Sequence, residues 1–563
     1  MRSHFGRFST LAFILLLSAC SGSSETADLI LTQGNVITVD EAQPRAQAIA
    51  IKGEKILAVG SNEQIDKLRG PQTEVIDLEG RTVVPGLVDG HLHFSRLGAD
   101  TSHIVELDDT RSLEEALTLI KRRAQGLKPG EWLSGRGWHV SNWGTERWPT
   151  ASDLDRVVPE NPASFVGMHS HASWLNSKAL QAANITRDRA DPEDGIIQRD
   201  PKTGIPNGIL IENAQWLVND VIPEAQQEPL KESIRKSIQL ALSYGFTGAH
   251  DLSVSVEVIQ AYRELVAEGD FPFRLNLYAR IWRTGELLDS LLADGPIIAE
   301  GNHRLSMRAI KLSIDGALGA RGAALLAPYS DEPQSTGVIR VPPDQVYEIV
   351  RQSLQSGFTA ALHAIGDRAN RIALDAVEKI LQENPLQDHR VRIEHAQIVA
   401  LEDIPRFAQL GVIASFQWMH STLDMSWAER RVGPERIQGG YAWRTFLDAG
   451  VRIIGGSDEG RRTFSPFMGI HAAVTRQDQD GNPPGGWYPE QRLSRLEALR
   501  SYTLDAAYAS FEEDVLGSIT PGKFADVTVL SRDILSVAPE EILETEAVMT
   551  LVGGKVVFDR NHE

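Results

Sequence analysis

The chain has 563 residues, of which 42% are hydrophobic and 23% are charged, and its formal net charge is −20. This composition excludes a disordered or fibrous protein, and so acidic a surface argues against nucleic-acid phosphate as a partner. The single cysteine, Cys20, excludes an intramolecular disulfide and any cysteine-rich metal site.

The N-terminus predicts a lipoprotein signal. A positively charged start precedes an apolar run that is too short to span about 30 Å of hydrocarbon, so we interpret residues 1–19 as a signal peptide. The sequence Leu-Ser-Ala-Cys resembles a bacterial lipobox, with Cys20 as the lipidated residue and residues 20–26 as a polar tether. Ser21 favours the outer membrane. We therefore expect an anchored protein of the bacterial cell envelope that faces the periplasm; the alternative is an ordinary secretory signal.

Both ends of the remaining chain predict β-structure. Residues 27–84 contain apolar or alternating runs separated by Gly and Asn, and residues 517–563 repeat this pattern with Gly-Lys and Gly-Gly turns. We expect one small composite β-sandwich built from both segments.

The centre, residues 85–516, alternates short apolar strands with helical stretches, which predicts an α/β fold with a (β/α)8 TIM barrel. The eight expected strands are Val83–His93, Phe246–Asp251, Arg274–Arg280, Ala309–Asp315, Thr359–Ile365, Val391–Ala396, Val412–Gln417 and Val451–Asp458. Residues 96–219 are too many for one connection and include six tryptophans, so we expect a large cap insertion after the first strand.

Several expected strands end in side chains that can bind a metal ion. His91 and His93 stand two residues apart, which places both imidazoles on one face of a strand. Lys311 lies within a buried strand, where a lysine is costly unless it is neutralised or used. A carbamate formed with CO₂ would make it an oxygen ligand. Alone, each of these residues is also compatible with a structural role.

Three further strands end in His363, His395 and Asp458. A lone histidine or aspartate at such a position is more often a packed or capping residue. Together with the preceding three side chains, however, they form one expected ring at the C-terminal face, where active sites of this barrel lie.

The segments PGLVDGHLH, IKLSIDGALG, HAIGDRAN, RIEHAQ and GGSD resemble the amidohydrolase superfamily, and within it the YtcJ-like branch that includes N-substituted formamide deformylases. The resemblance covers nearly the whole mature chain. It implies one ion held by His91, His93, Lys311 and Asp458, and a second held by Lys311, His363 and His395. The family places these ligands on strands 1, 4, 5, 6 and 8, in agreement with the strands counted above.

The resemblance implies a metal-dependent amidohydrolase that cleaves an exocyclic C–N bond, of amide or N-formyl type, in a small-molecule substrate. Imidazoles and oxygen ligands suit Zn²⁺, with Mn²⁺ or Fe²⁺ as alternatives, and one or two ions are compatible with the motifs. Asp458 is the expected catalytic base. The carbamate on Lys311 and a homodimer are inferred from the resemblance.

Residues outside these motifs predict a substrate pocket. The segment GMHSHASWLN resembles the family's GHxxWxN pattern, with Ser170 in place of Gly, which makes His171 and Trp174 expected pocket residues. Trp138 is a candidate aromatic wall. Arg321 is a candidate for binding a substrate carboxylate. For the tryptophans the alternative is packing within the insertion, and for Arg321 it is pairing with an aspartate.

Two other functions remain open at this point. The same fold and metals serve hydrolases of esters, lactones or phosphotriesters. A non-catalytic, metal-binding regulatory surface protein is the other possibility, although all six ligand positions are filled, which argues against it.

Overall fold

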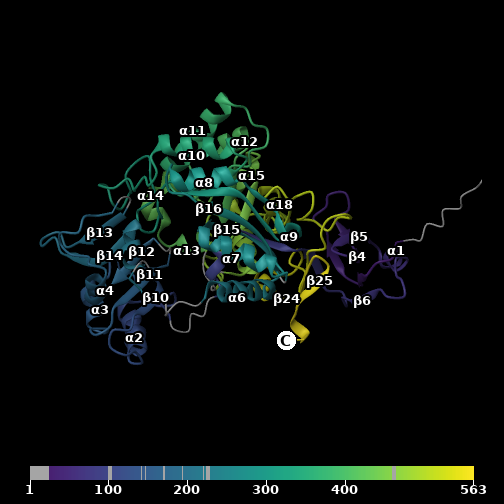
Figure 1. Cartoon of the computed structure of the whole chain (residues 1–563), viewed down its shortest axis with the longest axis horizontal. Coiled ribbons are helices and arrows are strands. Elements are labelled where there is room, and N and C mark those ends of the chain that lie inside the picture. The colour runs from purple at the N-terminus through teal and green to yellow at the C-terminus, as the bar shows by residue number, and fades with distance from the viewer. Residues whose placement is uncertain are drawn as a thin grey trace, which may run out of the picture.

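The computed structural model of the chain describes residues 25–98, 104–140, 142–145, 147–168, 171–192, 195–219, 221–222, 229–269, 271–458 and 464–562 (Figure 1). The expected signal peptide, the expected lipidation site Cys20 and most of the expected tether lie outside these residues. In the part of the chain that is described, no helix is both long and apolar enough to cross a membrane.

A parallel β-barrel forms the centre of the molecule, as the sequence predicts. Seven parallel pairings join its eight strands in chain order. They are β8 (Leu87–Leu92), β15 (Phe246–Val254), β16 (Arg274–Arg280), β18 (Leu305–Ser313), β19 (Thr359–Ala364), β20 (Arg392–His395), β21 (Ile413–Gln417) and β22 (Ile453–Gly456). A short strand, β17 (Ile297–Ala299), adds to β18 from outside.

The first and last barrel strands meet where the metal-ligand motifs lie. The backbone N–H of Asp458, just after β22, donates to the carbonyl of His91 on β8 at 2.8 Å. The N–H of Ser457 donates to the buried Asp89 carboxylate at 3.1 Å. A Cβ on Gly90 would lie 2.6 Å from the carbonyl oxygen of Gly455, so this close approach requires glycine. The barrel closure thus brings His91 and Asp458 together.

Helices surround the barrel between its strands. α11, for example, buries Ala369, Ala373, Leu374 and Val377 along one face, the spacing of an amphipathic helix. The helices that accompany the barrel are α6 (Leu230–Ser243), α7 (Val256–Ala267), α8 (Glu286–Asp294), α9 (Glu300–His303), α10 (Pro343–Gln355), α11 (Asp367–Glu383), α12 (Ile404–Leu410), α13 (Trp418–Asp424), α14 (Ala428–Arg436), α15 (Trp443–Asp448), α16 (Pro466–Thr475), α17 (Arg495–Ser501) and α18 (Leu504–Ala509).

Two further sheets stand on one side of the barrel and combine both ends of the described chain (Figure 1). In one of them, β23 of the C-terminal segment pairs with β7 of the N-terminal segment, with Val529 opposite Val83. The strands are β1 (Leu29–Thr32), β4 (Ala48–Lys52), β5 (Lys55–Gly60) and β6 (Glu74–Asp77) in the first sheet, and β2 (Asn35–Ile37), β3 (Arg45–Ala46), β7 (Thr82–Pro85), β23 (Val527–Leu530), β24 (Ala547–Val552) and β25 (Lys555–Asp559) in the second. Helix α1 (Asn62–Asp66) packs beside them.

The segment between β8 and β15 forms its own layer on the opposite side of the barrel, the cap (Figure 1). Its mixed sheet contains β9 (Val105–Glu106), β10 (Leu133–Trp138), β11 (Ala163–Gly167), β12 (Ala172–Leu175), β13 (Gly195–Arg199) and β14 (Pro206–Glu212). Its helices are α2 (Leu113–Ala124), α3 (Ala151–Asp155), α4 (Ser177–Ala182) and α5 (Trp216–Asn219).

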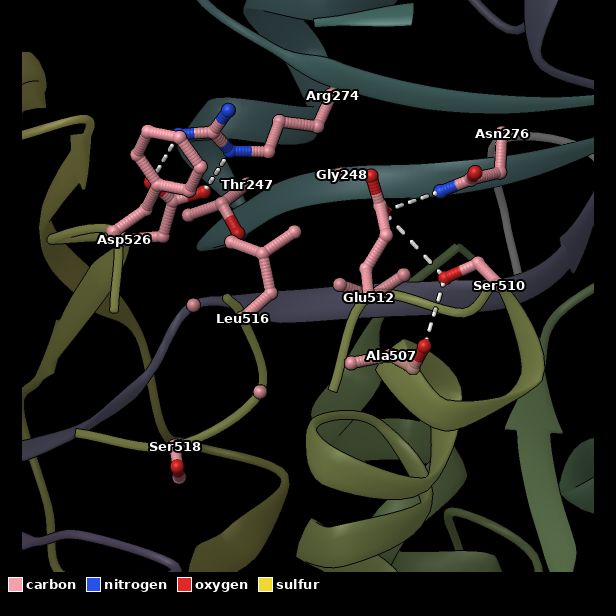
Figure 2. Close-up of a pocket in the computed structure, with 14 residues that line it drawn as sticks. Thr247, Gly248, Arg274, Asn276, Ala507, Ser510, Glu512, Leu516, Ser518 and Asp526 are labelled. Atoms are coloured by element: carbon pink, nitrogen blue, oxygen red, sulfur yellow. Dashed lines mark hydrogen bonds and ion pairs between the residues drawn. The ribbon is translucent and has the colours of Figure 1, made fainter. Parts of the chain in front are cut away.

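The amino-terminal end of the barrel holds a small pocket that both polar and apolar side chains line (Figure 2). Its volume of about 20 Å³ is enough for roughly one water molecule. Arg274 at the start of β16 binds both carboxylate oxygens of Asp526 at 2.6 and 2.9 Å, and Glu512 accepts from Asn276 at 2.9 Å. These buried groups satisfy one another, so the pocket joins the barrel to the C-terminal segment.

Candidate metal centre

Three histidines converge on one carboxylate at the carboxyl ends of the barrel strands. Oδ1 of Asp458 lies 3.1 Å from Nε2 of His91 and 3.4 Å from Nε2 of His93, and Oδ2 lies 3.9 Å from Nδ1 of His395. Ligand atoms of His91, His395 and Asp458 all lie within 4.8 Å of one another, close enough to share one metal ion.

Two more of the expected ligands adjoin this group. The rings of His363 and His395 are 4.4 Å apart between centroids. Lys311 lies on β18, next to the strand that carries His363. It is in register with Ala361, which precedes His363 by two residues. Its side chain is buried, and this burial lowers the pKa of its amine to about 8, although Glu394 and Asp458 oppose the shift. The six expected ligands therefore lie at or near the carboxyl ends of five barrel strands, β8, β18, β19, β20 and β22.

Hydrogen bonds behind the histidines set their tautomers. Nδ1 of His91 lies 2.5 Å from the Glu394 carboxylate, Nδ1 of His93 lies 2.8 Å from the Leu252 carbonyl, and Nδ1 of His395 lies 2.6 Å from Oε1 of Gln417. Each partner accepts, so each Nδ1 carries the proton and each Nε2 keeps its lone pair. This is the form in which imidazole binds a metal.

Unpaired buried nitrogens support the same conclusion. Within the described residues, Nε2 of His91 and Nε2 of His363 are buried without a hydrogen-bond partner. Such atoms are costly in a protein interior. A divalent cation would satisfy both, and an arrangement of imidazoles with one carboxylate suits that cation. The residues present therefore fit a metal centre.

Asp458 is held ionised in a strained position. Burial raises the pKa of its carboxyl group, but when the imidazoles are protonated the charges of His91 and His395 and the hydrogen bonds from His91 and His93 outweigh burial and hold that pKa well below its usual range. Its φ of 57°, and that of 71° at His395, fall in the left-handed region that non-glycine residues rarely adopt. Strain of this kind costs about 1–3 kcal/mol per residue and concentrates at functional sites.

An ion pair lies beneath the site. The side chains of Arg392 and Glu394 are both fully buried and bind each other, and Glu394 also holds His91. Arg392 further donates to the carbonyl of Gly90 at 2.5 Å and to Nδ1 of His250 at 2.8 Å. Burial and the Arg392 charge hold the pKa of His250 well below its usual range. No pattern in the sequence pairs Glu394 with His91, because the two residues are 303 positions apart.

The cap contributes one further histidine, His171, to the site. His171 comes within 5.7 Å of His363, between ring centroids, and its Nδ1 lies 2.9 Å from Glu212 at the end of β14. Arg340 binds the same Glu212 carboxylate at 3.1 Å. Glu212 was not among the residues singled out from the sequence.

His420 is a further neighbour of the site that sequence reasoning missed. It lies on α13, just after the seventh barrel strand β21, and its ring stacks on His395 with centroids 5.9 Å apart. The only sequence signal was its place shortly after an expected strand end.

The remaining expected pocket residues lie elsewhere. Trp138 and Trp174 are buried in the core of the cap, where their indoles donate to the carbonyls of Phe165 at 2.7 Å and Thr150 at 2.8 Å. This placement matches the packing alternative more closely than a substrate wall. Arg321 binds the Asp331 carboxylate at 3.0 Å. Pairing with an aspartate was the alternative to its binding a substrate carboxylate.

A parallel barrel that gathers histidines and an aspartate at the carboxyl ends of its strands defines the class of metal-dependent hydrolases. A model of the amidohydrolase family matches residues 74–558, and the chain belongs to this family.

Its relatives agree with this assignment and with the YtcJ-like branch. The chain is 32% identical over 536 residues to the putative amidohydrolase YtcJ of Bacillus subtilis (strain 168), with 94% of this chain and 99% of that one covered. It is 30% identical over 550 residues to an N-substituted formamide deformylase of Arthrobacter pascens, with 95% and 99% covered. The crystal structure of an uncharacterized metal-dependent hydrolase from Pyrococcus horikoshii OT3 matches with a TM-score of 0.70 at 28% identity, covering 91% of this chain and 99% of that one.

Proposed function

We propose that this hydrolase cleaves an exocyclic C–N bond of amide or N-formyl type. The observation that carries the proposal is the ionised Asp458 carboxylate among three histidines, at the barrel end where substrates enter. Support comes from the relatives over nearly their full lengths, one named an amidohydrolase and one a formamide deformylase.

The proposed metal ligands are the six residues named from the sequence, holding one or two divalent ions, with zinc as the first candidate: His91, His93, Lys311, His363, His395 and Asp458. When bound, a divalent ion supplies Lewis acidity and makes water acidic enough to ionise near neutral pH. We also propose that Lys311 carries a carbamate, formed when its neutral Nζ bonds to the carbon of CO₂ and one proton is released.

The side chains have separate tasks in the proposed reaction. Asp458 accepts a proton from water and passes it to the leaving amine. In its imidazolium form His171, from the cap, keeps Nδ1–H on Glu212 and donates Nε2–H to the substrate carbonyl oxygen as negative charge develops there. Glu394 keeps the lone pair of His91 directed at the ion.

A substrate screen on metal-loaded protein tests the proposal. The panel contains N-formyl amines, N-acyl amino acids and short peptides, with esters, lactones and phosphotriesters as competing classes. We expect turnover of at least one amide or N-formyl compound, and its loss on chelation. Cleavage confined to the competing classes would reject the bond type, and a protein that binds two ions but cleaves none of the compounds would favour a regulatory role.

We further propose that the enzyme acts in the bacterial envelope, anchored at Cys20. The support is the N-terminal sequence, with its apolar run ending in Leu-Ser-Ala-Cys.

A further inference from the structure

Arg280 occupies a position at the barrel mouth that the proposed reaction does not use. It is the last residue of β16, and its Cα is paired in register with that of Lys311 on β18. Tyr278, two residues earlier, packs inside the barrel against Leu252. Because side chains alternate along a strand, Arg280 shares the inward face of Tyr278, at the level of Lys311.

Two tryptophans border this guanidinium group. Its central carbon lies 5.2 Å from the ring centroid of Trp216, from the cap, and 5.3 Å from that of Trp282, which follows β16. The two indoles meet edge to face, 6.2 Å apart between centroids. Trp216 remains 43% exposed, so this cluster is open on one side.

Arg280 lacks an anionic partner of its own. A guanidinium group has five N–H donors, yet no acceptor or carboxylate of the described residues reaches them within hydrogen-bond or ion-pair distance. Glu257, at the exposed start of α7, attracts it only from beyond 4.0 Å. The two other arginines named above differ, because Arg340 binds Glu212 and Arg321 binds Asp331.

A chain of contacts joins Arg280 to the metal centre. Trp282 also lies 5.3 Å from the guanidinium carbon of Arg340, which binds Glu212. Glu212 in turn holds His171, which faces His363. A substrate whose carbonyl group lies at His171 therefore has Arg280 and the two indoles along the same rim of the site.

We propose that Arg280 binds a carboxylate group of the substrate, so that the enzyme prefers N-acyl amino acids and similar amides that carry a free carboxylate. A half-buried guanidinium without an acceptor is completed by a planar carboxylate, which it can bind through two parallel hydrogen bonds. Of the two guanidinium groups beside Trp282, that of Arg340 already binds Glu212, so the unpaired charge of Arg280 suits a single carboxylate. This substrate class rests on the function proposed above.

Matched compounds test the proposal. N-formylleucine and N-formylphenylalanine, both enantiomers of each, are compared with N-formyl-3-methylbutylamine and N-formyl-2-phenylethylamine, which lack only the carboxylate. For the wild-type protein we expect kcat/KM to favour an acid over its neutral counterpart by about 10- to 100-fold, mostly through KM. In Arg280→Gln this ratio falls to near one, and Arg280→Lys restores part of it.

Glu257→Gln is the control, because it removes the distant attraction on Arg280 without touching the guanidinium group. This variant should keep the wild-type ratio; a collapsed ratio would mean that Arg280 serves a structural pair with Glu257. Metal content and the melting temperature of each variant are measured alongside.

Binding is measured separately by calorimetry on metal-loaded protein, so that the two proposals can fail independently. Tighter binding of the acids that depends on Arg280, without turnover of any amide, keeps the carboxylate site and rejects the proposed reaction. Turnover without preference for the acids rejects the carboxylate site alone. Wild-type protein that binds no acid more tightly than its neutral counterpart also rejects it.

Discussion

Glu394 holds His91 from 303 positions away in the sequence, with its carboxylate oxygen 2.5 Å from the imidazole Nδ1. The same carboxylate neutralises the fully buried Arg392. One side chain thus fixes a metal-ligand tautomer and balances a charge in the barrel interior.

Glu394→Gln is therefore expected to have two effects. It leaves Arg392 buried without a counter-charge, which should lower the free energy of unfolding by about 3–5 kcal/mol. It also weakens the support of His91, which should reduce metal affinity by about 10- to 100-fold. Denaturant unfolding of the metal-free protein and metal analysis after dialysis measure the two effects.

Glu348→Gln serves as the comparison, because Glu348 forms a partly exposed pair with Arg351 on α10. It should change stability by less than about 1 kcal/mol and leave metal affinity unaltered. If Glu394→Gln behaved like this control, the role given to Glu394 would be incorrect.

Asp458→Asn should retain most of the bound metal while losing turnover by about 10²- to 10⁴-fold, because the amide side chain cannot accept the proton from water. Metal analysis and steady-state kinetics on the best amide from the screen decide the matter. Asp448→Asn, at a side chain that is 67% exposed on α15, should be neutral. Wild-type turnover in Asp458→Asn would exclude Asp458 as the base.

Glu212→Gln should lower kcat by about 10-fold or more with little change in metal content, because His171 loses the carboxylate that orients its ring. A double-mutant cycle with His171→Ala separates this effect from damage to the fold. If Glu212 acts through His171, then Glu212→Gln has little further effect on kcat once His171 is removed. Fully additive losses would instead assign Glu212 a structural role with Arg340.

Cys20→Ala should release the protein from the membrane fraction of the producing bacterium, since acyl chains on this residue are the proposed anchor. Fractionation and metabolic labelling with a fatty acid provide the measurement, and Ser21→Ala is the neighbouring control. Recovery of the wild-type protein in the soluble fraction without label would refute the anchor.

Much of the barrel and of its ligand set was predictable because those features are local. Apolar strands of four to nine residues alternate with amphipathic helices, and each ligand stands at or near the end of such a strand. Parallel strands in one barrel place these ends on one face, so His91, Lys311, His363, His395 and Asp458 are brought together by topology alone.

The supporting residues were not predictable in this way. A tryptophan in the cap looks the same in sequence whether it packs in a core, as Trp138 and Trp174 do, or stays partly exposed beside an arginine, as Trp216 does. An arginine is likewise ambiguous until its neighbours are known. Arg321 turns out to bind Asp331, whereas Arg280 has no such partner among the described residues.

The sequence by itself determined the family, the barrel and the residue types available for metal chemistry, because periodicity and motif spacing are properties of short segments. Only the tertiary structure decided which carboxylate supports which imidazole. Glu212 meets His171 across 41 positions and Glu394 meets His91 across 303, and such contacts depend on how the cap and the closed barrel pack. Hydrogen bonds act over about 3 Å, a scale that only the packed fold specifies.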